Sequence, residues 1–193
     1  MSVFRLLALC LPLHAWAAEP ADLQSSLQIE DSGLNSAGLL SVNAAAGLNH
    51  QQLNAQAIAI GQQVLTRLEL LQKLELGPVD LKQDAQVEIL GASFSGGNGL
   101  TGVNQAAGVG NQQINAFRMG LGSQRQDLDD SVLSQQNVIA PANLSGSAGQ
   151  PKGNRMVVTD DQTFAGSRGV VQLNQSAGVG NRSVNSLSLN VVD

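Results

Sequence analysis

The sequence has little of what usually builds a globular core or a reactive site. Of its 193 residues, one is cysteine, none is tyrosine, and aromatic residues make up 3%. Because aromatic side chains dominate most packed cores, this chain must gain its stability from other contacts. The single cysteine, Cys10, excludes an intrachain disulfide and a cysteine-rich metal site.

Charged residues are scarce as well, at 13% of the chain, with a formal net charge of -5. A weakly negative chain is a poor partner for nucleic acid or for an anionic membrane surface, so neither is expected. Few charges also remove the usual barrier to self-association. Gly, Ser, Ala, Asn and Gln are abundant instead, and this polar, uncharged bias is typical of segments that form β-aggregates.

The first residues have the pattern of a secretory signal peptide. A lone cation at Arg5 is followed by an apolar run over 6–13 and by the small-residue motif Ala15-Trp16-Ala17. The run is too short to cross a membrane, which takes about 20 residues. We therefore predict a signal peptide over 1–17, cleavage between Ala17 and Ala18, and export of a mature chain without cysteine.

Three segments, 38–54, 99–115 and 169–185, share one gapless pattern, G-[LV]-x-x-[VL]-N-x-[AS]-A-G-[LV]-x-x-x-x-[LIV]-N. The first Asn of the pattern recurs after 61 and then 70 residues, whereas the second Asn always follows the first by 11. Fixed internal spacing with variable external spacing is typical of repeats joined by linkers. Similarity beyond the pattern places the units at 25–61, 86–122 and 156–193.

Each unit ends in a stretch with period-2 alternation, which indicates strands, and its Gly residues indicate tight turns. Such a unit cannot bury its apolar face alone and needs neighbours, which are either its sister repeats or other chains. The sequence therefore predicts an all-β fold in which three imperfect repeats form a β-solenoid-like or cross-β stack of sheets, with flexible linkers.

The two linkers differ from the repeats. Residues 62–85 carry Leu68, Leu71 and Leu74 at near-helical spacing, and Glu69 and Lys73 form a possible i,i+4 pair, which favours an amphipathic helix. The alternation over 68–76 also permits a strand. Residues 123–155 hold acidic residues, Pro and Gly with few large apolar side chains, so we predict a disordered, flexible linker.

The repeated amides are the candidate functional residues. If the units stack in register, equivalent side-chain amides can form hydrogen-bonded ladders along the stack. The alternative is that these residues occupy turns, which Asn tolerates well. The predicted self-assembly set is Asn43, Asn54, Asn104, Gln112, Gln113, Asn115, Asn174 and Asn185.

No residue pattern indicates catalysis. After signal cleavage His50 is the only histidine, and the other two repeats have Asn111 and Asn181 in its place, so it is neither a repeated ligand nor part of a Ser/His/Asp set. The acidic clusters lie in predicted linkers, and the Gly-rich segments lack the Lys-Ser/Thr of a phosphate-binding loop. We expect no enzyme activity, no cofactor and no metal.

The unit V-N-x-A-A-G-x-x-x-Q-Q-x-N, present in three imperfect copies with two linkers behind a signal peptide, resembles the Fap functional-amyloid subunits of Pseudomonas-type bacteria. The resemblance implies export through the periplasm, passage through an outer-membrane secretion pore, and assembly with itself and with other amyloid subunits into extracellular fibrils that support biofilms. Residues 189–193 lack the Cys-x-x-Cys expected near the end of the major subunit, so the minor, nucleating subunit is the better match.

Two other functions remain open from the sequence. The chain could be a periplasmic chaperone or accessory factor that keeps fibril subunits soluble. It could also be a monomeric β-solenoid adhesin that binds a surface. Low charge and three complete repeats favour assembly over both.

Overall fold

The computed structural model describes residues 24–62, 68–77, 83–122, 133–139 and 153–192, so the predicted signal peptide and its cleavage site lie outside the described part. The described residues form strands and no helix. The strands are β1 (Gln24–Glu30), β2 (Ala37–Leu48), β3 (Gln51–Gly61), β4 (Leu70–Leu76), β5 (Asp84–Leu90), β6 (Asn98–Val109), β7 (Gln112–Gly122), β8 (Leu133–Ile139), β9 (Arg155–Thr159), β10 (Arg168–Val179) and β11 (Arg182–Val192).

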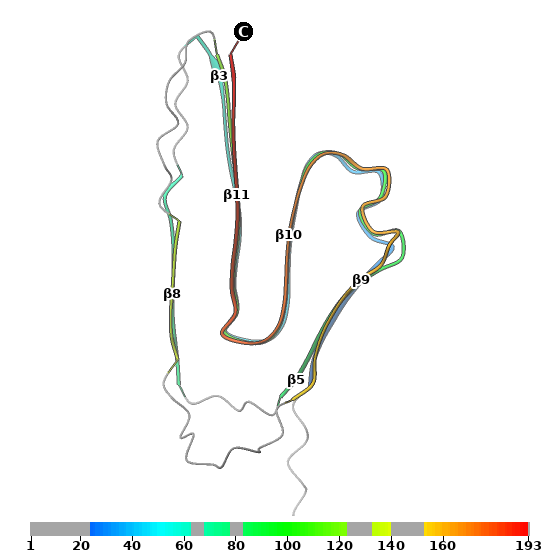
Figure 1. Ribbon diagram of the computed structural model, residues 1–193, viewed down its shortest axis with the longest axis vertical. Helices are drawn as coiled ribbons and strands as arrows, with labels where there is room; N and C mark the ends of the chain where they lie inside the picture. The colour runs from blue at the N-terminus through cyan, green and yellow to red at the C-terminus, as the bar shows by residue number, and fades with distance from the viewer. Residues whose placement is uncertain (1–23, 63–67, 78–82, 123–132, 140–152, 193) are drawn as a thin grey trace, which may run out of the picture.

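Each repeat contributes three strands to one layer, and the three layers stack on one another. We call them layer 1 (β1 to β3), layer 2 (β5 to β7) and layer 3 (β9 to β11). Equivalent strands pair in parallel as sheet A (β1-β5-β9), sheet B (β2-β6-β10) and sheet C (β3-β7-β11), with layer 2 always in the middle. Figure 1 looks down the stack, so the three layers follow nearly the same path one behind another.

The register joins equivalent residues of the repeats. Asn104 of β6 pairs with Asn43 of β2 on one side and with Asn174 of β10 on the other. Likewise Asn115 of β7 pairs with Asn54 and Asn185. The predicted all-β stack of three repeats is therefore confirmed, and the 61- and 70-residue spacings in the sequence are the register of sheets B and C. In sheet A, β1 and β5 pair one residue short of the 61-residue spacing, with Gln24 opposite Asp84.

Sheets A and B pack through an apolar seam. Val87 and Ile89 of β5 and Val103 of β6 are fully buried there. Equivalent side chains of the outer layers pack against them, including Leu27, Ile29, Val42 and Leu173. This seam supplies most of the conventional hydrophobic core, because aliphatic side chains at alternate positions of two facing sheets exclude water.

A turn of unusual backbone geometry joins sheet A to sheet B in every layer. Phe94 and Phe164 have positive φ angles of 59° and 61°, and Gly33 occupies the corresponding conformation in layer 1 with φ 70°. The rings of Phe94 and Phe164 stack with centroids 5.3 Å apart. A Cβ on Gly33 would lie 2.6 Å from Phe94 Cδ1, so the absent side chain makes room for the ring of the layer above.

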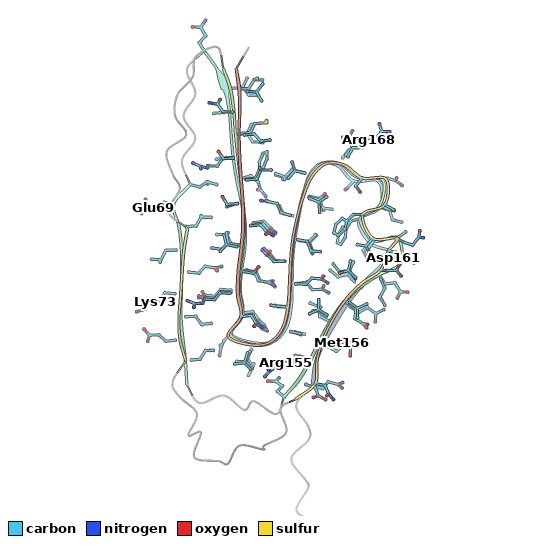
Figure 2. The ribbon with its side chains drawn as sticks, viewed as in Figure 1. Glu69, Lys73, Arg155, Met156, Asp161 and Arg168 are labelled. Atoms are coloured by element: carbon cyan, nitrogen blue, oxygen red, sulfur yellow. The ribbon has the colours of Figure 1, made fainter. Side chains whose placement is uncertain are left out.

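Residues 62–85, for which the sequence permitted either a helix or a strand, contain the strand β4. In β4 the side chains of Gln72 and Leu76 are buried while Lys73 and Glu75 are exposed, which is the alternation of a half-buried strand. Lys73 pairs with Glu75 at 2.8 Å and not with Glu69 four residues earlier. Figure 2 shows Lys73 on the side of β4 that faces away from sheet C. The helix expectation is thus wrong for Leu70–Leu76.

Residues 123–155, expected to be a disordered linker, contain strand β8, which pairs in parallel with β4 from Leu70 opposite Leu133 to Leu76 opposite Ile139. Residues 123–132 and 140–152 of the same linker lie outside the described part. The expectation failed for β8 because a seven-residue segment of mixed composition can still extend a ladder when a neighbouring strand offers backbone partners.

Candidate self-assembly interface

The predicted amide residues meet in the seam between sheets B and C. Asn104 on β6 and Asn115 on β7 face one another across this seam, where the Nδ2 of Asn115 donates to the Oδ1 of Asn104 at 3.1 Å. The same contact recurs in layer 1 between Asn54 and Asn43 at 2.9 Å, and in layer 3 between Asn185 and Asn174 at 3.0 Å. Each layer therefore holds one hydrogen-bonded Asn pair.

The Asn pairs are also joined from layer to layer. On sheet B, Asn174 donates to Asn104 at 3.0 Å and Asn104 donates to Asn43 at 2.9 Å. On sheet C, Asn185 donates to Asn115 at 3.0 Å and Asn115 donates to Asn54 at 2.9 Å. Two ladders thus run along the stack and are cross-linked in every layer, and we call them together the Asn ladder.

Backbone carbonyls fix the orientation of these amides. The Nδ2 atoms of Asn54, Asn115 and Asn185 donate to the carbonyls of Val42, Val103 and Leu173, and those of Asn104 and Asn174 donate to the carbonyls of Leu53 and Ile114. A carbonyl oxygen only accepts, so the atom that faces it must be the amide nitrogen. The donor direction along the ladder is therefore set by the backbone.

Gln residues form shorter ladders beside the Asn ladder. Gln112 donates to Gln51 at 2.9 Å, on the side of sheet C that faces β4. In the seam between sheets B and C, Gln52 donates to Gln113 at 2.9 Å, and Gln113 donates to Ser176 of layer 3 at 3.0 Å. Both Gln112 and Gln113 are fully buried. All eight residues of the predicted set are thus placed in interlayer contacts.

Sequence reasoning missed one further Gln row. Gln105 and Gln175 on sheet B face sheet A, and Gln175 donates to Gln105 at 2.9 Å. Gln105 is fully buried and also donates to the carbonyl of Glu88 at 2.9 Å. Layer 1 has Ala44 at this position, so the row covers only two layers. The repetition of Gln at one pattern position was the available signal.

The turn between sheets B and C carries a second missed row, formed by His50, Asn111 and Asn181. Asn181 N donates to the Oδ1 of Asn111 at 3.0 Å, and Asn111 N approaches the Nδ1 of His50 at 3.3 Å. Asn111 donates to the carbonyl of Ala107 at 2.9 Å, and Nε2 of His50 lies 3.0 Å from the carbonyl of Ala46. The imidazole therefore makes the same two contacts as the Asn amide.

These contacts require a neutral His50 with the proton on Nε2, because Nδ1 accepts and Nε2 donates. Burial lowers the pKa of the imidazole below its usual value, against hydrogen bonds with the backbone of Ala46 and Gly108 that raise it. Burial thus favours the protonation state that the row requires.

Gly102 shows how tightly the seam is packed. A Cβ at this position would lie 2.8 Å from the Oδ1 of Asn54 and 3.8 Å from the Nδ2 of Asn115. The end layers have Ser41 and Gln172 at the same position. In the middle layer the glycine therefore leaves room for the side-chain amide of Asn54 in layer 1.

The end layers expose what the middle layer buries. Leu39 and Leu48 of β2 are 56% and 65% exposed, whereas their partners Leu100 and Val109 in β6 are 8% and 6% exposed. Between β10 and β11 lies a groove of about 560 Å³, lined by Val170–Leu173 and Val184–Leu187. Within the described residues, the strands of layers 1 and 3 in sheets A, B and C pair with a neighbouring strand on one side only, and they carry half-covered apolar rows.

Residues 14–192 match the family described as "Functional amyloid protein FapB/FapC family". The chain belongs to this family. Its members are structural amyloid subunits, which accords with the interlayer amide rows and with the resemblance found in the repeats. No solved structure matches the chain.

The described part of the chain holds neither a clustered metal site nor a membrane-spanning helix. Its residues include no group of three or more His, Cys, Asp or Glu side chains placed to hold a metal ion. They also include no helix that is long and apolar enough to cross a membrane.

Proposed function

We propose that this member of the FapB/FapC family is a secreted subunit whose copies stack end to end, layer 3 of one copy on layer 1 of the next, into extracellular fibrils that support biofilm formation. The observation that best supports this proposal is the contrast in burial between the middle and end layers. The pattern residues of layer 2 are buried by a layer on each side, and those of the end layers lack one such neighbour.

A second copy is the partner that fits these faces. Layers 1 and 3 have the same pattern, so a neighbouring copy continues the 61- and 70-residue register with the same residue types. Its Asn pair extends the Asn ladder, and its β strands satisfy the free backbone groups of sheets A, B and C. Because such a contact is head to tail and leaves a free face after each addition, it generates an open filament.

The same geometry supports a nucleating role. Ordering the first layers of a stack is the costly step, because loop closure and chain entropy must be overcome before neighbouring layers contribute. One chain of this protein forms three layers in register by itself, and so it offers a finished template to other subunits of its system. We propose these subunits and an outer-membrane secretion pore as its partners.

The test is to incubate the processed chain, beginning at Ala18, alone and as a seed for a related major subunit. We expect Thioflavin T fluorescence, fibre reflections near 4.7 and 10 Å, and a shortened lag in the seeded reaction. A chain that stays monomeric and lengthens the lag would instead be a chaperone. A monomer that unfolds cooperatively and leaves the lag unchanged would fit an adhesin.

A further inference from the structure

The two end faces of the stack are chemically different. The amide-to-amide hydrogen bonds between layers in the Asn ladder run one way, with Nδ2 of the later repeat donating to Oδ1 of the earlier one. One bond to the backbone runs the other way, from Nδ2 of Asn115 to the carbonyl of Gln172 at 3.3 Å. Asn104 and Asn174 make the diagonal bond in the same direction, to Asn54 at 3.2 Å and to Asn115 at 3.0 Å. The ladder therefore has a donor end and an acceptor end.

Layer 1 is the donor end. The Oδ1 of Asn43 already accepts from Asn54 and Asn104, but its Nδ2 has no hydrogen-bond partner within the described residues. In its equivalents Asn104 and Asn174, Nδ2 donates to the ladder Asn of the preceding layer and to a backbone carbonyl of that layer, which is that of Leu53 or Ile114. The matching carbonyl for Asn43 would be that of Val184 in the next copy.

Layer 3 is the acceptor end. Asn185 uses its Nδ2 for three bonds, to Asn115, Asn174 and the carbonyl of Leu173, while its Oδ1 has no donor within the described residues. In layers 1 and 2 the equivalent Oδ1 atoms, those of Asn54 and Asn115, each accept a hydrogen bond from the following layer. The free oxygen of Asn185 is therefore the acceptor that a further layer would use.

Burial gives an independent sign of this polarity. Gln172, Asn174 and Ser176 on β10 are buried although layer 3 is an end layer. Their equivalents on β2, which are Ser41, Asn43 and Ala45, are exposed. The side chains on sheet B thus incline toward the preceding layer, so layer 2 covers these three residues of layer 3, whereas no described layer covers their equivalents in layer 1.

We infer that the docking surface is selective, so that the layer 1 face of one copy binds only the layer 3 face of another. Two layer 1 faces would oppose amide donors, and two layer 3 faces would oppose carbonyl oxygens, leaving buried polar groups unpaired. Like faces would also reverse the strand direction that every pairing of the stack shares. This inference rests on the proposed function and adds that fibrils have two unlike ends, of which each accepts only one face.

The substitution Asn43→Asp isolates the layer 1 face. Both bonds that Asn43 makes within its own chain are accepted by Oδ1, and a carboxylate keeps them. The substitution removes the amide donor that faces outward from layer 1. It also places a negative charge next to the Oδ1 atoms of Asn174 and Asn185 of the next copy. The matched control is Asn98→Asp, because Asn98 lies exposed on β6 outside the ladder and undergoes the same charge change.

Fluorescent Asn43→Asp chains are added to tethered wild-type fibrils and observed by single-fibril microscopy. The variant keeps a wild-type layer 3 face, so we expect it to bind the fibril end that exposes layer 1 and to stop growth there, with no binding at the other end. Mixed in small amounts into wild-type chains, it should slow growth at that end by roughly tenfold or more, as expected when a buried charge loses its partners.

The Asn98→Asp control should extend fibrils as the wild-type chain does. Binding of Asn43→Asp at both ends, binding at neither, or continued growth past the variant would overturn the selective docking while leaving fibril assembly intact. A wild-type chain that forms no fibrils would overturn the proposed function itself and the inference with it.

Discussion

The middle and end repeats share one sequence pattern but differ in what surrounds them. In layer 2 the pattern residues are buried whether they are aliphatic, such as Ile114, or polar, such as Asn104 and Gln105. In layers 1 and 3 the equivalent Leu53, Val184 and Asn43 remain partly or fully exposed. The pattern therefore does not encode burial by itself, because a cross-β layer buries its residues most completely when layers lie on both sides.

The two seams offer a second contrast. The seam between sheets A and B is filled mainly by aliphatic side chains, whereas that between sheets B and C holds the Asn ladder. A buried polar network is stable only when its members are satisfied, and here each ladder Asn of layer 2 bonds both neighbouring layers. Loss of one amide should therefore cost more in the middle than at an end.

The largest difference between middle and end is expected for the stacked phenylalanines. Phe94 is 3% exposed in layer 2 and Phe164 is half-buried in layer 3. Phe94→Ala should lower the free energy of unfolding by about 3–5 kcal/mol, the usual cost for a buried Phe, and Phe164→Ala by clearly less. Guanidinium denaturation of the soluble chain measures both, and equal losses would contradict the assigned burial.

Fibrils sharpen this comparison. In the proposed stack Phe164 is covered by the Gly33 turn of the next copy, so the two substitutions should destabilise fibrils by more similar amounts than they do the soluble chain. Guanidinium depolymerisation of the two variants provides the measurement. A difference as large in fibrils as in the soluble chain would argue against layer 3 being covered.

Asn104→Asp tests the Asn ladder at its centre. The carboxylate removes donors to Asn43, Asn54 and the carbonyl of Leu53, and buries a charge among oxygens. We expect a loss of about 3 kcal/mol or more and a clearly longer lag in Thioflavin T assays. Unchanged kinetics would count against the ladder, and Asn98→Asp serves as the exposed control on the same strand.

Gly102→Ala tests the close packing beside the ladder. The added methyl would meet the Oδ1 of Asn54 at 2.8 Å, and overpacking of this kind costs about 1–3 kcal/mol. The equivalent change in layer 1, Ser41→Ala, removes one exposed hydrogen bond from Gln56 and should cost less than about 1 kcal/mol. Denaturation midpoints of the two variants compare the layers directly, and a neutral Gly102→Ala would show that the seam has spare room.

The smallest expected effect is a pH dependence at His50. Its pKa is lowered in the folded chain, so the unfolded chain binds the proton more readily and stability falls with decreasing pH. The contribution is fully present above the unfolded pKa of about 6.5 and is lost as the pH falls from there through the lower folded value. Strand β4 lies beside the residue that follows His50, since Gln51 donates to the carbonyl of Lys73. The charged side chains of Lys73 and Glu75 on this strand are exposed and pair with each other.

The variant His50→Asn places in layer 1 the residue that layers 2 and 3 already have. We expect it to retain the row with Asn111 and to flatten the pH dependence of the denaturation midpoint between pH 7.5 and 5, a range set by the imidazole pKa of about 6.5. The effect should amount to about 1 kcal/mol, as for one hydrogen bond. An unchanged pH profile in this variant would assign the dependence to other groups.

Several features could be predicted from the sequence because they repeat. The three repeats and the equivalence of Asn43, Asn104 and Asn174 follow from equal residue types at a constant spacing within each repeat, whereas the number of layers formed by one chain and their stacking order could not be decided from the sequence. The strand β4 could not be decided, since the same leucines satisfy a helical and an alternating pattern and only the contact with sheet C selects one. The row of His50 was missed because the sequence does not indicate that an imidazole can make the same two hydrogen bonds as an Asn amide.

The amino-acid sequence already requires its repeats to stack, since they are too short to bury their own faces and their residues offer amides in place of charges, thiols and aromatic side chains. The folded stack is needed to show which rows face which seam, which layer is buried, and that the amide-to-amide bonds of the Asn ladder share one direction. The physical reason is that the direction of a side chain in a stack depends on the carbonyls and layers around it, and these come from residues 61 and 70 positions away.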